Sequence, residues 1–144
     1  MASGFLIDTN VLSELMRGTP APQVLDWFAT QTPTQLYTSV ITYAEMLAGV
    51  ALLPAGKRRE GLAQATQQMF EEDFAGRCLD FSGLAVSHYA MVRAQRQQAG
   101  RPIDTADAQI AAIALAGNLT LVTRNTKDFA GIDALNIINP WQAH

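Results

Sequence analysis

The chain has 144 residues, enough to bury one sizeable core, so we expect a single domain over residues 1–144. Of these residues 49% are hydrophobic and only 16% are charged, a smaller charged share than in an average globular protein, so we expect a partner to cover part of the surface. Its one cysteine, Cys78, excludes an internal disulfide framework, and because no apolar run approaches the roughly 20 residues that span a bilayer and no secretory signal is evident, we expect a cytoplasmic protein with no membrane partner. The formal net charge of −3 argues weakly against a nucleic-acid partner, since such partners favour a basic surface.

A short apolar run near the N-terminus ends in a carboxylate. Phe5, Leu6 and Ile7 are followed by Asp8 and two further polar residues. A fully apolar run bounded by turn-forming residues indicates a buried strand of a parallel sheet. Asp8 then lies at the carboxyl end of that strand, which is the edge where open α/β sheets place their sites.

The rest of the chain alternates between helical and strand patterns. Helices are predicted at about residues 10–16, from residue 22, from residue 42 to near residue 54, at 57–73, from Ser82 to about residue 99, and at 105–116. Strands are predicted at 35–40, 77–81, 119–123 and 136–138, with a turn or short helix at 126–129. Strands that alternate with helices predict an α/β domain whose mainly parallel sheet of about five short strands has helices on both faces.

Several acids lie where helices are expected to begin, and each has a purely structural explanation. Asp8 could simply cap the helix that follows it. Thr42 and Glu45 have the spacing of a capping box. Asp104 and Asp107 fall in a first helical turn, where the helix dipole favours acids. Taken singly, each acid is explained better by capping than by catalysis.

The expected topology changes that balance by placing the acids on one edge. The helices near residues 10 and 42 follow strands directly, so they begin at the carboxyl edge of the sheet. The helix at 105–116 leads into a strand and runs antiparallel to it, so it begins at the same edge. Because adjacent strands lie about 5 Å apart, Asp8, Glu45 and Asp107 can converge if their strands are neighbours.

Such a cluster of acids needs a cation, because converging carboxylates repel one another. Hard oxygen ligands without a nearby cysteine or histidine favour Mg²⁺ over zinc, and Mn²⁺ is expected to support activity too. A divalent ion of this kind suits phosphoryl chemistry, since it activates water and polarises the phosphoryl oxygen. Setting aside Asp8, Glu45, Asp104 and Asp107 leaves nine acidic residues against 10 basic ones, a balance compatible with a polyanionic substrate.

Short motifs recur in order along almost the whole chain. They are LIDTNVLSE at 6–14, ITYAE at 41–45 with GV at 49–50, PI at 102–103, AD at 106–107 with IAA at 110–112, LVTRN at 121–125 with DF at 128–129, and NPW at 139–141. Each motif is weak alone, but their order is specific. It resembles the PIN domain, in particular the toxin ribonucleases of bacterial VapBC-type toxin–antitoxin pairs, including the FitB-like branch.

The resemblance implies a PIN-like three-layer α/β/α fold and a divalent-metal-dependent endoribonuclease that acts as the toxin of its pair. Carried over from the family, Asp8, Glu45 and Asp107 are the metal-binding catalytic acids, and Thr9 and Thr123 line the pocket. The resemblance also implies an RNA substrate, a homodimer, and neutralisation by a small DNA-binding antitoxin.

The chain departs from the family at one acidic position. The family often has a fourth acid directly after the Thr-Arg pair, where this chain has Asn125. An amide oxygen can bind a metal ion but brings no charge, which leaves the number of ions open, with Asp104 and Asp128 as candidate substitutes. Arg124 could contact a substrate phosphate or be an ordinary surface arginine.

The sequence leaves other interpretations open. The chain could be a non-catalytic PIN-like binding module whose acids are only caps, or a PIN-like nuclease that acts on DNA or structured RNA without an antitoxin. The basic run at residues 57–59 is most simply a solvated helix start, with phosphate contact outside the pocket as the second interpretation. The apolar residues gathered at 46–53 favour a homodimer.

Overall fold

The computed structural model describes residues 4–142, which form one sheet of five strands, all parallel. The strands are β1 (Phe5–Ile7), β2 (Leu36–Ser39), β3 (Cys78–Leu79), β4 (Thr120–Val122) and β5 (Ile137–Ile138). Their order across the sheet is β3-β2-β1-β4-β5, so β1 is central and lies between β2 and β4. The predicted α/β class and the parallel sheet of about five short strands are confirmed.

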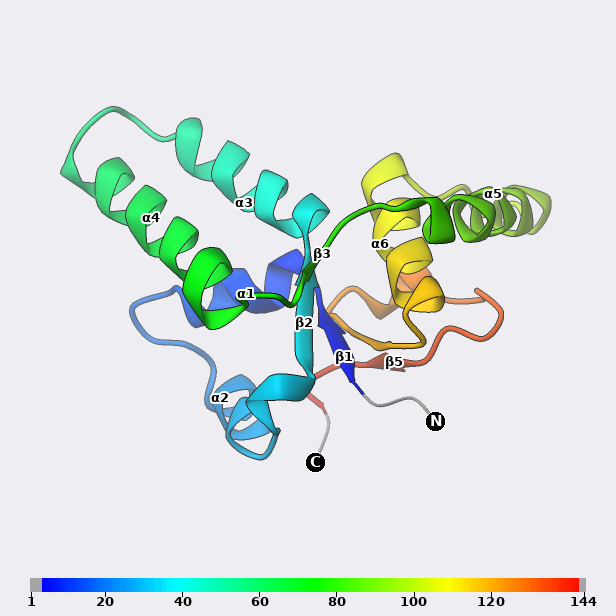
Figure 1. Ribbon diagram of the computed structural model, residues 1–144, viewed down its shortest axis with the longest axis horizontal. Coiled ribbons are helices and arrows are strands. Elements are labelled where there is room, and N and C mark those ends of the chain that lie inside the picture. Colours follow the sequence, from blue (N-terminus) through cyan, green and yellow to red (C-terminus); the bar gives the residue numbers. More distant parts are fainter. Residues whose placement is uncertain (1–3, 143–144) are drawn as a thin grey trace.

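Helices connect the strands and cover both faces of the sheet (Figure 1). Between β1 and β2 lie α1 (Thr9–Leu15), α2 (Pro22–Ala29) and the 3-10 turn η1 (Pro33–Gln35); between β2 and β3 lie α3 (Val40–Ala51), α4 (Lys57–Gln68) and the π-helical turn η2 (Met69–Asp73); α5 (Gly83–Gln98) and α6 (Thr105–Ala116) precede β4, and the 3-10 turn η3 (Thr126–Phe129) follows it. Figure 1 shows α1 to α4 on one side of the sheet and α5 and α6 on the other. Across residues 4–142, no helix is long and apolar enough to cross a membrane.

Alternating side chains of the two central strands build a separate core on each face of the sheet. Leu6 and Leu121 pack with apolar residues of α5 and α6, whereas Ile7 and Val122 pack with those of α1 to α3. All four side chains are fully buried. Burial of an aliphatic side chain contributes about 1.5–3 kcal/mol, so the two cores fix β1 and β4 as neighbours. The acids that follow these strands are thereby held on a rigid edge.

The start of α3 differs from the prediction. Ser39 is its N-cap, and the Ser39 hydroxyl accepts a hydrogen bond from the backbone N–H of Thr42 at 3.2 Å. The helix therefore begins at Val40, two residues before the predicted start, and Glu45 lies in its second turn. The capping box suggested for Thr42 and Glu45 is wrong, because a capping box needs its acid three residues after the cap.

Candidate active site

Asp8 lies in a hydrogen-bond network at the carboxyl edge of β1. Its side chain is only 4% exposed. Oδ1 accepts from the backbone N–H of Thr9 at 2.8 Å, and Oδ2 accepts from the Thr123 hydroxyl at 2.8 Å and from the Asn10 amide at 3.1 Å. The Thr9 bond is an N-cap of α1, as the structural explanation requires. The Thr123 bond comes from the end of the neighbouring strand, and capping gives no reason for it.

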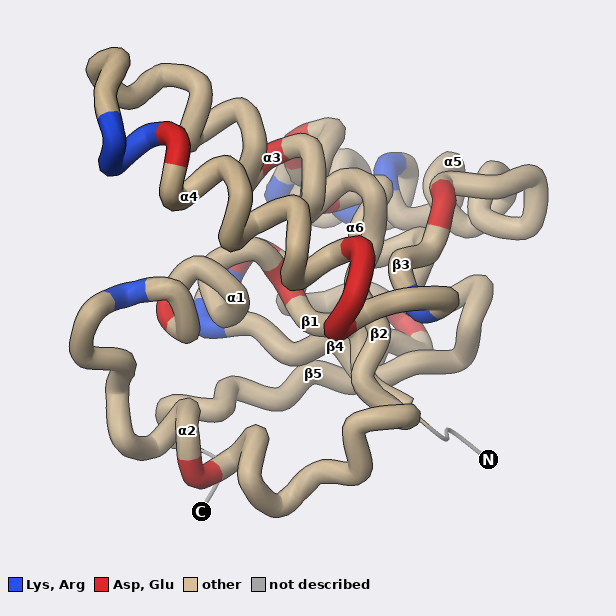
Figure 2. The backbone as a smooth tube through the Cα atoms, turned by 60° about the vertical axis from the view of Figure 1, so that its left-hand side comes forward, with Lys and Arg blue, Asp and Glu red and all other residues tan. Residues whose placement is uncertain are grey.

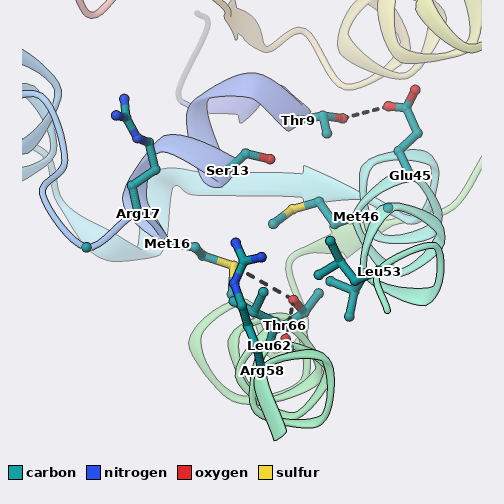
Figure 3. Close-up of a pocket in the computed structure, with 13 residues that line it drawn as sticks. Thr9, Ser13, Met16, Arg17, Glu45, Met46, Leu53, Arg58, Leu62 and Thr66 are labelled. Atoms are coloured by element: carbon teal, nitrogen blue, oxygen red, sulfur yellow. Dashed lines mark hydrogen bonds between the residues drawn. The ribbon is translucent and has the colours of Figure 1, made fainter. Parts of the chain in front are cut away.

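Glu45 reaches the same edge from the second turn of α3. Its Oε1 accepts a hydrogen bond from the Thr9 hydroxyl at 2.6 Å (Figure 3). The Oγ1 atoms of Thr9 and Thr42 lie 3.2 Å apart. The Glu45 side chain is otherwise exposed. Because Ser39 already caps α3, the helix has no need of Glu45, and its contact with the residue that follows Asp8 calls for another explanation.

Asp107 approaches from the acidic start of α6 (Figure 2). Asp104 is the N-cap of α6, and its Oδ1 accepts a hydrogen bond from the backbone N–H of Asp107 at 2.8 Å. Burial raises the pKa of Asp107 to about 7, assisted in decreasing order by the charges of Asp104, Asp8, Asp128 and Glu45. The predicted acids therefore act on one another electrostatically, as carboxylates that share a site do.

Burial also raises the pKa of Asp8, with a smaller contribution from the charge of Glu45, while its hydrogen bonds act in the opposite direction. As their side chains are placed, no group of three His, Cys, Asp or Glu residues among residues 4–142 forms a ready-made metal cage. The donors gathered here are nevertheless carboxylate and hydroxyl oxygens, which suit a hard divalent cation. A bound cation would favour the charged carboxylates that burial and mutual repulsion disfavour.

The segment after β4 carries three further predicted residues. Thr123 is fully buried, and besides donating to Asp8 its hydroxyl oxygen accepts from the backbone N–H of Asn125 at 3.1 Å. Asn125 and Asp128 are exposed. The backbone carbonyl of Asp128 accepts a hydrogen bond at 2.6 Å from the buried guanidinium of Arg96 in α5, which helps to fix the segment. Thr123 belongs to the network, whereas Asp128 acts on it through its charge.

Arg124 lies at the border of the network and is not a free surface side chain. Its guanidinium carbon lies 4.6 Å from the centroid of the Trp141 ring, a cation–π contact. Its backbone N–H donates to the carbonyl oxygen of the Asn10 side chain at 3.0 Å. The first contact holds the exposed side chain of Arg124 against Trp141, the second ties its backbone to Asn10, and its charge acts on the carboxylate of Glu14.

Asn10 is the functional candidate that the sequence analysis did not single out. Its amide nitrogen donates to Asp8 Oδ2 and to the Thr123 hydroxyl, at 3.1 and 3.2 Å, and its carbonyl oxygen accepts from Arg124. Asn10 thereby ties the end of β1 to the end of β4. The signal available in the sequence was an amide side chain two residues after an acid at a strand end.

A cleft of ≈ 610 Å³ lies next to the acids and is lined at one end by Thr9 and Glu45 (Figure 3). It continues between α1, α3 and α4. Of the basic run 57–59, Arg58 lines the cleft, whereas Arg59 donates to the backbone carbonyl of Leu53 at 3.4 Å.

Together, the fold and the acids define an α/β domain with a carboxylate cluster at the carboxyl edge of its parallel sheet. The family model for the PIN domain matches residues 5–135, so the chain belongs to the PIN domain family. The resemblance drawn from the ordered motifs is thereby confirmed over most of the chain.

Within this family, the chain is similar to several individual proteins over nearly its whole length. It is 46% identical to the plasmid stability protein StbB of Pseudomonas syringae pv. tomato, over 96% of this chain and 99% of the relative. It is 42% identical to the VapC ribonuclease Y4jK of Sinorhizobium fredii, over 95% of this chain and 97% of the relative. It is 39% identical to the toxin FitB of Neisseria gonorrhoeae, over 94% of this chain and 97% of the relative. It also superposes on a chain of the structure of FitAB bound to an IR36 DNA fragment with a TM-score of 0.90, at 38% identity and over 97% of each chain.

Proposed function

We propose that this chain is the toxin of a toxin–antitoxin pair and acts as a divalent-metal-dependent endoribonuclease. The observation that carries the proposal is the convergence of Asp8 from the end of β1, Glu45 from α3 and Asp107 from α6: the residue after Asp8 donates a hydrogen bond to Glu45, and the charges of Asp8 and Glu45 both act on Asp107. The names of two relatives support RNA cleavage and the role as a toxin, since one is a VapC ribonuclease and the other is the toxin FitB, and each is matched over nearly its whole length.

In this proposal Asp8, Glu45 and Asp107 hold Mg²⁺ or Mn²⁺, with Asn125, Asp104 and Asp128 as further candidate ligands. When bound, the ion supplies an activated water and polarises the phosphoryl oxygen of the scissile bond. Thr123 and Asn10 orient the Asp8 carboxylate, and Thr9 orients that of Glu45, through neutral donors that leave the negative charges intact.

Arg124 completes the proposed site on the substrate side. In this proposal its exposed guanidinium, which packs against the Trp141 ring, contacts a phosphate of the RNA. An arginine is suited to this task because its donors match the oxygens of a phosphate in pairs.

We also propose a small DNA-binding antitoxin as partner, a homodimer as the assembly state, a cytoplasmic location and one domain over residues 1–144. The structure of FitAB with DNA supports the antitoxin. For the homodimer, Leu52 in the apolar 46–53 stretch is 87% exposed, although Met46 of the same stretch is buried in the core.

The test is cleavage of RNA by the purified chain and by Glu45→Gln. Wild type should cleave in Mg²⁺ or Mn²⁺ and stop in chelator. Glu45→Gln should lose most of this activity but keep the fold, because the amide oxygen can still accept from Thr9 while the charge of the ligand is gone. The matched control is Glu60→Gln, which removes an exposed acid from the first turn of α4.

A fully active Glu45→Gln variant would sink the assignment of Glu45. A wild type that cleaves no RNA, free of its antitoxin and supplied with metal, would favour the non-catalytic binding module. Cleavage of DNA or structured RNA, together with the absence of any antitoxin that neutralises it, would favour the nuclease without an antitoxin.

A further inference from the structure

The cleft of ≈ 610 Å³ begins at the acid cluster but is not used by the mechanism above. Thr9 and Glu45 line its inner end, and from there it follows the α3–α4 pair (Figure 3). Its volume falls within the range of about 300–1,000 Å³ that is typical of small-ligand sites. The cleft is therefore open to a substrate group that extends from Glu45 along α3 and α4.

The walls of the cleft combine apolar and cationic side chains. Apolar surface comes from Met16 at the C-cap of α1, from Met46 in α3 and from Leu62 in α4, and positive charge comes from Arg17 and Arg58. Arg17 is partly neutralised, because its guanidinium lies 3.2 Å from the carboxylate of Glu14. Arg58 extends from α4 toward the α1 side of the cleft in Figure 3.

We propose that this cleft binds a nucleotide of single-stranded RNA adjacent to the scissile bond, with its base against the apolar wall and its phosphate at Arg58. The inference rests on the proposed function. Bases splayed out of a single strand stack on aromatic side chains or arginine guanidinium planes, with cations along the backbone, and a base held in a pocket also packs against apolar side chains. The residues that line this cleft supply the arginines and the apolar side chains. A strand whose scissile phosphate lies at the acids continues on both sides, and the cleft offers the complementary charge and surface to one neighbouring nucleotide.

Two variants separate the phosphate contact from the base contact. Arg58→Gln removes the cation from the cleft, and Lys57→Gln is its control, because Lys57 carries the same charge in the same helical turn but does not line the cleft. Gly49→Phe fills the cleft: a Cβ atom built at Gly49, in the last turns of α3, meets no atom within 4 Å. Gly49→Ala is its control, since one methyl group leaves the space open.

The measurement is the fluorescence anisotropy of a labelled single-stranded RNA, recorded in chelator so that cleavage cannot occur. Arg58→Gln should raise the Kd about tenfold, the effect expected for a lost hydrogen bond to a charged group. It should also lower the slope of log Kd against log salt concentration by about 0.7, the value for one phosphate contact on a single strand. Gly49→Phe should raise the Kd without changing that slope, and both controls should bind as wild type does.

Thermal melts establish that each variant is folded, and light scattering establishes that Gly49→Phe keeps the oligomeric state of wild type, because Gly49 lies in the apolar 46–53 stretch. A parallel assay measures binding of the proposed antitoxin. The proposal is overturned if Arg58→Gln and Gly49→Phe bind RNA as their controls do, if Lys57→Gln loses as much affinity as Arg58→Gln, or if wild type binds no RNA. Loss of antitoxin binding with unchanged RNA binding would assign the cleft to the antitoxin. RNA cleavage in Mg²⁺ tests the nuclease separately. If wild type binds RNA at the cleft but does not cleave it, the proposed nuclease activity is rejected and the proposed nucleotide site is not.

Discussion

Neutralising Asp107 distinguishes a metal ligand from a helix-capping acid without any substrate. The change is Asp107→Asn, and the assay is a thermal melt in chelator and again in millimolar Mn²⁺. If Asp107 only favours the first turn of α6, the variant loses about 0.3–1 kcal/mol of dipole interaction, whatever metal is present. If it belongs to the acid cluster, the chelated variant is relieved of the cost of a charge that is half-buried and lies beside other acids, and it becomes more stable than wild type at neutral pH.

The size of that relief follows from the pKa of Asp107, which rises from its ordinary 3.8 to about 7 on folding. Taken in full, this shift corresponds to about 4 kcal/mol of destabilisation above pH 7, and solvent screening at a half-buried site reduces it to about 2 kcal/mol. Because the folded state holds the proton more tightly, the penalty is absent below about pH 4 and complete above about pH 7. Asp107→Asn should therefore match wild type at pH 4 and melt about 4–8 °C higher at pH 7.5.

Adding Mn²⁺ should reverse the order of the two melting temperatures, so that wild type melts above Asp107→Asn. An ion at about 100 times its Kd stabilises the folded wild type by about 2.7 kcal/mol, or roughly 5–10 °C, because it binds only the folded site. Asp107→Asn should gain much less. Asp133→Asn, which removes an exposed acid outside the cluster, should gain as much as wild type. Equal gains in wild type and Asp107→Asn would refute Asp107 as a ligand, and a stability difference in chelator that ignores pH would refute the repulsion.

Two further outcomes follow from the network and from the apolar surface. Asn10→Ala should lower the free energy of unfolding by about 1–3 kcal/mol, because Asp8 and Thr123 lose a hydrogen-bond donor and the backbone N–H of Arg124 loses its acceptor. Urea unfolding measures this loss, and an unchanged midpoint would show that these hydrogen bonds do not stabilise the fold. Light scattering of the chain at micromolar concentration should give the mass of a homodimer, whose interface would commonly bury about 2,000 Å² or more, and a monomer alone would contradict the partner surface inferred from Leu52.

The order of the elements could be predicted because each has a strong local signal. The run before Asp8 is fully apolar, and the start of α6 is marked by Asp104. The start of α3 could not be placed, because Ser39 and Thr42 are both good caps and β-branched residues stand between them. Pairing of β2 with β3 at Ser39 and Leu79 ends the strand there, which is tertiary information.

The candidate site was predictable as a set of acids but not as a network. The expected topology placed Asp8, Glu45 and Asp107 on one edge, yet the convergence depended on which strands were neighbours, and periodicity does not give that order. Only the adjacency of β1 and β4 joins Asn10 to Thr123, 113 residues away in the chain. The cleft was hidden for the same reason, because its walls come from three helices.

Two acids at opposite ends of α1 show how a structural carboxylate differs from a functional one. Glu14 is buried, but the pKa of its carboxyl is lowered, first by the backbone N–H of Ala21 and then by Arg17, so its charge is matched within the fold. Asp8 is also buried, and there burial outweighs the hydrogen bonds and raises the pKa of the carboxyl, while the side chains bonded to it, Asn10 and Thr123, are neutral. Neutral donors orient a carboxylate without cancelling its charge, which leaves that charge for a cation. A fold that needed Asp8 only as a cap would gain nothing by burying an unmatched charge beside two more acids, and this cost is what the proposed metal ion would remove.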